Sequence, residues 1–304
     1  IAAHGPTSPQ PPAQEPADLG NPTRTSVRRQ FSTIARRQMR LIVSDRGYFI
    51  FLAILPFIMG VLSLSVPGDV GFGVPVPAIQ GGEAPNEPGQ ILVLLNVGAI
   101  FMGTALTIRA LIGERAIFLR EQAVGLSTTA YLLAKVIVFA AFAVLQSSIV
   151  TAINIWGKKW GPGAVTSGAV IPNRSLELFT DMAACCVAAA MVGLALSALA
   201  KSNEQIMPLL VIAIMSQLVF QGGMIPVTGR IGLDQLSWIT PARWGFASTA
   251  STIDLIRLVP GPLTPQDSHW KHTPGAWWFN MAMLGLICIG YLSLVRWKIR
   301  LKTR

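Results

Sequence analysis

The sequence predicts an all-α membrane protein with six transmembrane helices, and three observations carry that prediction. Hydrophobic residues make up 52% of the 304 residues. Charged residues make up only 12% of the chain, against about 25% in an ordinary soluble domain. The hydrophobic residues also gather into six blocks, each close to the roughly 20 residues that a helix needs to cross a bilayer.

The residues before the first block divide into a linker and a helix. Residues 1–23 are rich in proline and poor in large apolar side chains, so we expect a disordered linker that follows an upstream domain of a longer polypeptide. Residues 24–46 are rich in arginine, and their apolar residues recur near a helical period. This pattern predicts an amphipathic connecting helix in the membrane interface, ahead of a six-span domain over residues 47–304.

Six apolar segments are the spans that we expect. They cover residues 48–66, 90–112, 130–156, 176–200, 205–227 and 276–295. The loop after the first span contains acidic residues but no Lys or Arg, whereas basic residues precede the first span and follow the last. Basic residues favour the cytoplasmic side, so we expect both termini in the cytoplasm, although the loop after the third span then places Lys158, Lys159 and Arg174 outside.

The segment between the fifth and sixth spans, residues 228–274, is too polar to cross a bilayer and too apolar for a free loop. Aromatic and aliphatic residues alternate there with charged residues such as Arg243. We therefore expect a short re-entrant helix that dips into the outer leaflet, with its polar groups held by protein or water. Tryptophans at the outer span ends predict an aromatic belt: Trp156, Trp160, Trp277 and Trp278.

A short charged segment joins the second and third spans. Acidic and basic residues stand at both of its ends, and residues 117–119 between them are apolar. This pattern predicts an amphipathic helix at the cytoplasmic mouth, with one face that can fit a groove in a soluble partner. The residues alone leave open an ordinary interfacial loop that obeys the positive-inside rule.

Two motifs resemble the membrane domain of ABCG-type (White family) ABC exporters. The run E-R-x-x-F-x-R-E at residues 114–121, followed by A-Y-x-x-A-K at residues 130–135, is similar to the loop that couples that domain to its ATPase. The run F-Q-G-G-M-I-P at residues 220–226 and S-x-x-x-P-x-R-W-G-F at residues 237–246 resemble the end of the fifth helix and the re-entrant segment of the same family. The resemblance covers nearly the whole chain from Arg24 onward.

The resemblance implies roles for particular residues in a dimer of two identical copies. The coupling helix would use Glu114, Arg115, Phe118, Arg120 and Glu121. A substrate slot between the second and fifth spans of both copies would be lined by Phe101, Met102, Ala105, Met215, Leu218 and Val219. Gly223 and Met224 would form the outer gate. The chain departs from the family in two ways. Arg109 stands where several members have an acid while its counterpart near Val144 is apolar, and the outer-loop cysteines of those members are missing, so we do not infer drug-pump specificity.

The resemblance also implies an ABC ATPase domain in the same polypeptide, which would bind ATP and Mg²⁺ outside this sequence. The chain contains no Gly-x-x-x-x-Gly-Lys-Ser/Thr phosphate loop, so we expect no ATP hydrolysis by this chain alone. A thin apolar slot indicates a lipid or amphiphile as the substrate. The expected function is outward transport by alternating access, by a multi-pass protein of a bacterial plasma membrane.

Other functions stay open: a polysaccharide- or drug-exporting permease, a membrane scaffold for regulatory domains, and a membrane-embedded enzyme acting on a lipid carrier. The enzyme would need acids inside the membrane, and Asp181 is almost the only candidate. His269 and His272 lack a convincing third ligand, so we expect no metal, cofactor or catalytic site. The net charge of +10 comes largely from basic residues that flank the spans and meet lipid headgroups, so we expect no nucleic-acid partner.

Overall fold

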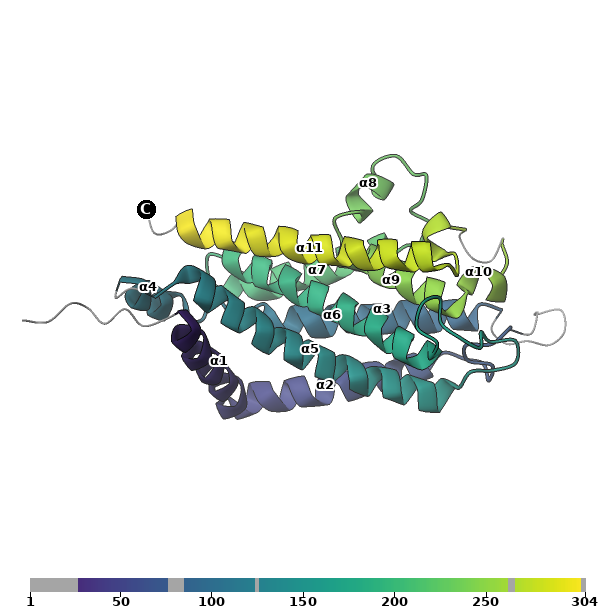
Figure 1. Ribbon diagram of the computed structural model, residues 1–304, viewed down its shortest axis with the longest axis horizontal. Coiled ribbons are helices and arrows are strands. Elements are labelled where there is room, and N and C mark those ends of the chain that lie inside the picture. Colours follow the sequence, from purple (N-terminus) through teal and green to yellow (C-terminus); the bar gives the residue numbers. More distant parts are fainter. Residues whose placement is uncertain (1–26, 76–84, 124–125, 262–265, 302–304) are drawn as a thin grey trace, which may run out of the picture.

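The structure, a computed structural model, describes residues 27–75, 85–123, 126–261 and 266–301. Within these ranges six helices are long and apolar enough to cross a membrane, and no strand forms. The long helices lie roughly side by side in an elongated bundle, with α1 and α4 at one end and α10 at the other (Figure 1). The predicted all-α, six-span fold is confirmed.

Helices α1, Val27–Ser44, and α2, Arg46–Leu64, meet at a sharp corner (Figure 1). Asp45 makes the corner because its carboxylate accepts a hydrogen bond from the Tyr48 backbone N–H and caps α2. One face of α1, including Ile34 and Ile42, is buried, and the arginines Arg36 and Arg40 are exposed. The predicted connecting helix thus exists from residue 27 onward, and the predicted linker lies outside the described residues.

The centre of the bundle is built from α3, Glu87–Thr107, and α6, Arg174–Leu199, with α5, Thr128–Lys158, packed against both. Small residues let α3 and α6 approach closely. A Cβ added to Gly103 of α3 would lie 2.2 Å from the carbonyl oxygen of Cys186 in α6. These three helices begin and end within a few residues of their predicted bounds, except that α3 stops at Thr107 rather than near residue 112.

The fifth span is shorter than predicted. It consists of a 3₁₀ turn, Asn203–Gln205, and α7, Ile206–Phe220, and it ends seven residues before the predicted end at residue 227. The cause is Gly222, whose φ of +87° lies in the left-handed region that favours glycine and ends a helix. The last span, α11, runs over Pro274–Leu301; it begins two residues before and ends six residues after the predicted range of 276–295.

Four short helices fill the segment between α7 and α11: α8, Leu233–Ser237; α9, Pro241–Ile253; α10, Leu255–Leu258; and a 3₁₀ turn, Ser268–Trp270. Every residue of α9 is buried, and α9 packs against α3, α6 and α11. Its Arg243 has partners within the protein, since Asp267 Oδ2 lies 2.5 Å and Thr228 Oγ1 3.0 Å from Arg243 Nη2. Protein groups therefore satisfy part of the polarity of this segment, as its sequence predicts.

Candidate coupling site and substrate slot

The candidate coupling helix is α4, Arg115–Ala123, which lies beside α1 at one end of the bundle (Figure 1). Phe118 is its buried residue, with only 6% of its surface exposed. The ring centroids of Phe118 and Tyr131, the latter on α5, lie 4.4 Å apart. This aromatic pair fixes one face of α4 to the start of α5.

Charged groups hold the two ends of α4 to its neighbours. Glu121 forms an ion pair with Arg37 of α1, and Glu114 Oε2 lies 3.8 Å from the Arg37 guanidinium. Glu114 Oε1 lies 2.9 Å from Lys135 Nζ on α5. Lys135 is fully buried and also donates to Gln38 Oε1 and to the Ala110 carbonyl, at 2.8 and 2.9 Å. Because a buried cation without partners is very costly, this network makes α1, α4 and α5 one unit.

The two flanks of α4 are open. Ile117 and Leu119 are 49% and 41% exposed and lie on either side of Phe118, because successive helix residues turn by about 100°; Arg115 and Arg120 are also exposed. A short helix with an exposed aliphatic side chain on each flank and guanidinium groups beside them fits an apolar groove with an acidic rim. Of the predicted coupling residues, Phe118, Glu114 and Glu121 therefore face the bundle and Arg120 faces outward, while Arg115 is exposed at the edge of a cavity that Phe118 and Tyr131 also line.

The sequence identified Ile117 and Leu119 only as apolar residues of the helix, and the structure shows that both are exposed. Arg37, Gln38 and Lys135, which hold the helix in place, were not among the predicted coupling residues. The role of Lys135 could have been predicted, because a cation close to the start of an apolar span needs polar partners. The residues of α1 are far away along the chain and carried no such signal.

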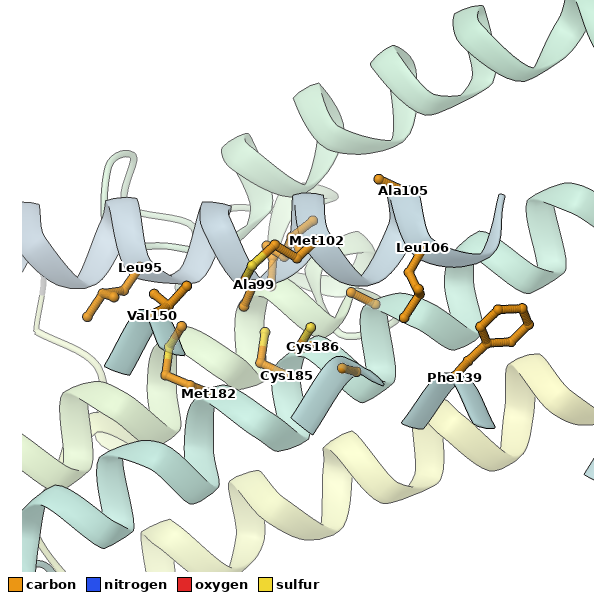
Figure 2. Close-up of a cluster of buried hydrophobic side chains, with 14 of the residues drawn as sticks. Leu95, Ala99, Met102, Ala105, Leu106, Phe139, Val150, Met182, Cys185 and Cys186 are labelled. Carbon is orange, nitrogen blue, oxygen red and sulfur yellow. The ribbon is translucent and has the colours of Figure 1, made fainter. Parts of the chain in front are cut away.

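The candidate slot residues fall into two groups. Phe101, Leu218 and Val219 are half-buried, and Met215 is 54% exposed on α7, which packs against α3. Met102 and Ala105 are 0% and 6% exposed. They belong to the buried cluster that also includes Cys185 and Cys186 of α6 (Figure 2). The structure thus brings α3 and α7 together and places two of the six predicted side chains inside the bundle.

The candidate gate residues line a cavity at the other end of α3. Gly223 and Met224 form part of its wall, together with Val93 and Leu94 of α3 and the segment after α2, and its volume is about 530 Å³. Met224 is 64% exposed. Gly223 needs to be small because an added Cβ would lie 2.3 Å from the ring of Phe246 on α9.

Arg109 is exposed and lines a cavity of about 470 Å³ together with Asp45, Tyr48 and Glu114. Its expected counterpart, Val144, is 39% exposed on α5. At this end of the bundle the fully buried Lys135 pairs with Glu114, which is partly buried.

Asp181, the acid that an enzyme would need, is fully buried and bonded inside the bundle. Its Oδ1 accepts from Trp277 Nε1 at 2.9 Å, and its Oδ2 lies 2.6 Å from the Thr252 hydroxyl. The belt prediction is therefore wrong for Trp277, which is 4% exposed, because its indole N–H bonds to Asp181 in the core. Trp156 and Trp278 are 81% and 60% exposed.

The two histidines lie apart from any metal-binding arrangement. The His269 ring stacks on Phe279, and the His272 ring bonds to the Ser251 carbonyl. Among the residues that the structure describes, no three His, Cys, Asp or Glu side chains group closely enough to hold a metal ion.

Comparison with known proteins places this chain in a family. Residues 29–253 match the ABC-2 type transporter family, and the chain belongs to it. The chain is 71% identical over 303 residues to the ABC transporter ATP-binding/permease protein Rv1747 of Mycobacterium tuberculosis (strain ATCC 25618 / H37Rv). The match covers 99% of this chain and 34% of that relative, so the chain spans about a third of the relative's length. The chain is thus a multi-pass permease domain of an ABC transporter, and the ATPase part is not in it.

Proposed function

We propose that this chain is the permease half of a homodimeric, ABCG-type exporter that moves a lipid or amphiphile outward by alternating access. The observation that carries the proposal is the two-sided character of α4. One face is tied to α1 and α5 by Phe118, Glu114 and Glu121, and Ile117 and Leu119 on the two flanks are exposed at the exterior of the bundle. When a soluble domain displaces a helix that is held in this way, α1 and α5 move with it.

The stroke would start when ATP and Mg²⁺ close the ATPase domains against α4. Because side-chain contacts join α4 to α1 and α5, the displacement would pass to the turn at residues 108–114 and so to α3. Within this turn the backbone N–H groups of Leu111 and Ile112 donate to the Ser197 hydroxyl of α6. Helix α7 is largely exposed and is the slot wall with the fewest restraints. Tilting α3 and α7 would collapse the slot and release the cargo toward the cavity beside Met224.

The proposal extends to the rest of the polypeptide and to the cargo. The name of the similar protein, ATP-binding/permease, supports an ATPase domain in the same polypeptide. We place that domain and both termini of the membrane domain in the cytoplasm, because basic residues flank the first and last spans. The proline-rich first residues and the loops also resemble a mycobacterial half-transporter in which phosphopeptide-binding FHA domains and an ATPase precede the membrane domain. That resemblance indicates a cell-envelope lipid of the phosphatidylinositol mannoside type, which suits an apolar slot.

The coupling assignment predicts the behaviour of a double variant, Ile117→Ser with Leu119→Ser. Both side chains are exposed, so dimer assembly and the thermal midpoint should stay close to those of the parent. The stimulation of ATPase activity by total polar lipids of the native membrane should fall about tenfold, because two interface contacts together supply about 1–2 kcal/mol. The measurement is ATP turnover by the full-length protein in lipid nanodiscs.

Leu236→Ser is the matched control, since Leu236 is 54% exposed on α8, far from α4 in the bundle (Figure 1). It should leave the stimulation unchanged. Phe118→Ala should lose coupling and also stability, because its ring is buried. Full stimulation in the double variant would refute the role of α4.

The same assay separates the alternative functions. A polysaccharide or drug exporter would respond to those compounds and not to the lipids. A scaffold would show no stimulation by any compound and no effect of the double variant. A lipid-carrier enzyme is disfavoured because both oxygens of Asp181 are engaged inside the bundle.

A further inference from the structure

A groove lies between α7 and α11, the two helices that pack on α6 and α9 (Figure 1). Residues of α6 form its floor, and the start of α9 at Thr240 and Pro241 closes one end. Its volume is about 250 Å³, and most of its lining is aliphatic, for example Leu209, Ile212 and Leu294. This groove has the size for part of a single aliphatic chain and too little room for a large ligand.

One polar side chain in the groove has no partner. Gln217 of α7 is 3% exposed, and neither its amide nitrogen nor its amide oxygen has a hydrogen-bond partner among the residues that the structure describes. The hydroxyl groups of Ser216, Thr240 and Tyr291 also line the groove, but each donates its hydrogen to a backbone carbonyl oxygen. An unpaired amide inside a membrane bundle is costly, which points to a ligand that completes it.

The groove is separate from the candidate slot. In an α-helix each residue turns about 100° from the one before it, so Gln217 projects from the face of α7 opposite to Met215, Leu218 and Val219. An occupant of the groove would therefore lie behind α7, between it and α11. Binding in this groove would not require coupling to an ATPase.

We propose that the groove binds an aliphatic chain that bears a hydroxyl group, such as a long-chain alcohol in the bilayer. A hydroxyl oxygen accepts from Gln217 Nε2 while its hydrogen is donated to Gln217 Oε1, so one neutral group satisfies both amide atoms. An ester carbonyl only accepts and leaves Oε1 unpaired. A carboxylate adds a charge that the aliphatic walls cannot compensate. Water lacks the aliphatic contacts that this lining favours.

Photolabelling tests the proposal with two matched probes. One is a long-chain alcohol with a diazirine in its chain, and the other is the methyl ether of the same chain, which accepts but cannot donate. With full-length protein in nanodiscs, the alcohol should label peptides of α7 and α11 about fivefold more than the ether, because the alcohol forms one hydrogen bond more than the ether and one net hydrogen bond accounts for about that factor. The readout is mass spectrometry of the labelled peptides.

Two variants make the result specific. Gln217→Leu keeps the volume and removes the amide, so the preference for the alcohol should disappear while the protein stays folded. Ala213→Phe should fill the groove, whose wall includes Ala213, and reduce labelling by both probes. Equal labelling of the parent by both probes, or a preference that survives Gln217→Leu, would overturn the proposal and leave water or a general lipid as the occupant.

Discussion

Helices α6 and α7 are neighbouring apolar spans, but most of α6 is buried in the bundle and most of α7 is not. The mean hydropathy is 2.2 for the most apolar window of α6 and 1.4 for the fifth span as a whole, Asn203–Phe220, which includes the polar turn before α7; 78% of the first window is buried against 17% of the second. Alanine, glycine and cysteine dominate the middle of α6, whereas α7 points large side chains such as Val211 and Ile212 outward. Small side chains permit packing on every face, so α6 forms the centre of the bundle, whereas α7 lies at its edge.

The largest effect should come from crowding the contact between α3 and α6. Gly103→Val should lower stability by about 3 kcal/mol, because its Cβ would overlap the Cys186 carbonyl and the neighbouring backbone. The protein should express poorly and lose its sharp size-exclusion peak in detergent. Gly285→Val on α11 is the control, since an added Cβ there has no atom within 4 Å, and it should behave as the parent does.

Truncating a methionine should have a smaller effect on stability, and the loss should be greater on α6 than on α7. Met182→Ala on α6 removes a fully buried side chain and should cost about 2 kcal/mol. Met215→Ala on α7 removes a side chain that is 54% exposed and should cost less than about 0.5 kcal/mol. Thermal unfolding in one detergent measures both. Equal losses would contradict the distinction between a central and a peripheral helix.

The smallest effect should come from the hydrogen bond that ties α11 to α6. Trp277→Phe keeps an aromatic ring and removes the donor to Asp181, so stability should fall by about 1 kcal/mol. Trp278→Phe, at a side chain that is 60% exposed, should have almost no effect. The two thermal midpoints, compared at one pH, check this prediction; a larger loss at Trp278 would mean that the core contact is unimportant.

The sequence predicted where the candidate coupling helix lies along the chain, but not which of its faces contacts the bundle. The charges at residues 114–121 were enough to predict a short amphipathic helix, and the motif resemblance gave it a role. Which side faces the bundle depends on Tyr131 and Arg37, whose positions are set by other helices. Phe118 therefore proved to be an anchor, and Ile117 and Leu119 emerged as the outward surface only from the structure.

Span number and approximate span positions follow from sequence alone, because a bilayer demands long runs of apolar residues whatever those runs touch. The tertiary structure decided which polar groups find partners inside the bundle. Lys158 meets Glu87 at 2.9 Å, and Trp277 meets Asp181, across large separations along the chain. Such pairings depend on how whole helices dock, and local composition does not encode them. The unpaired amide of Gln217 is the clearest case, since only the arrangement around α7 shows that nothing in the described chain completes it.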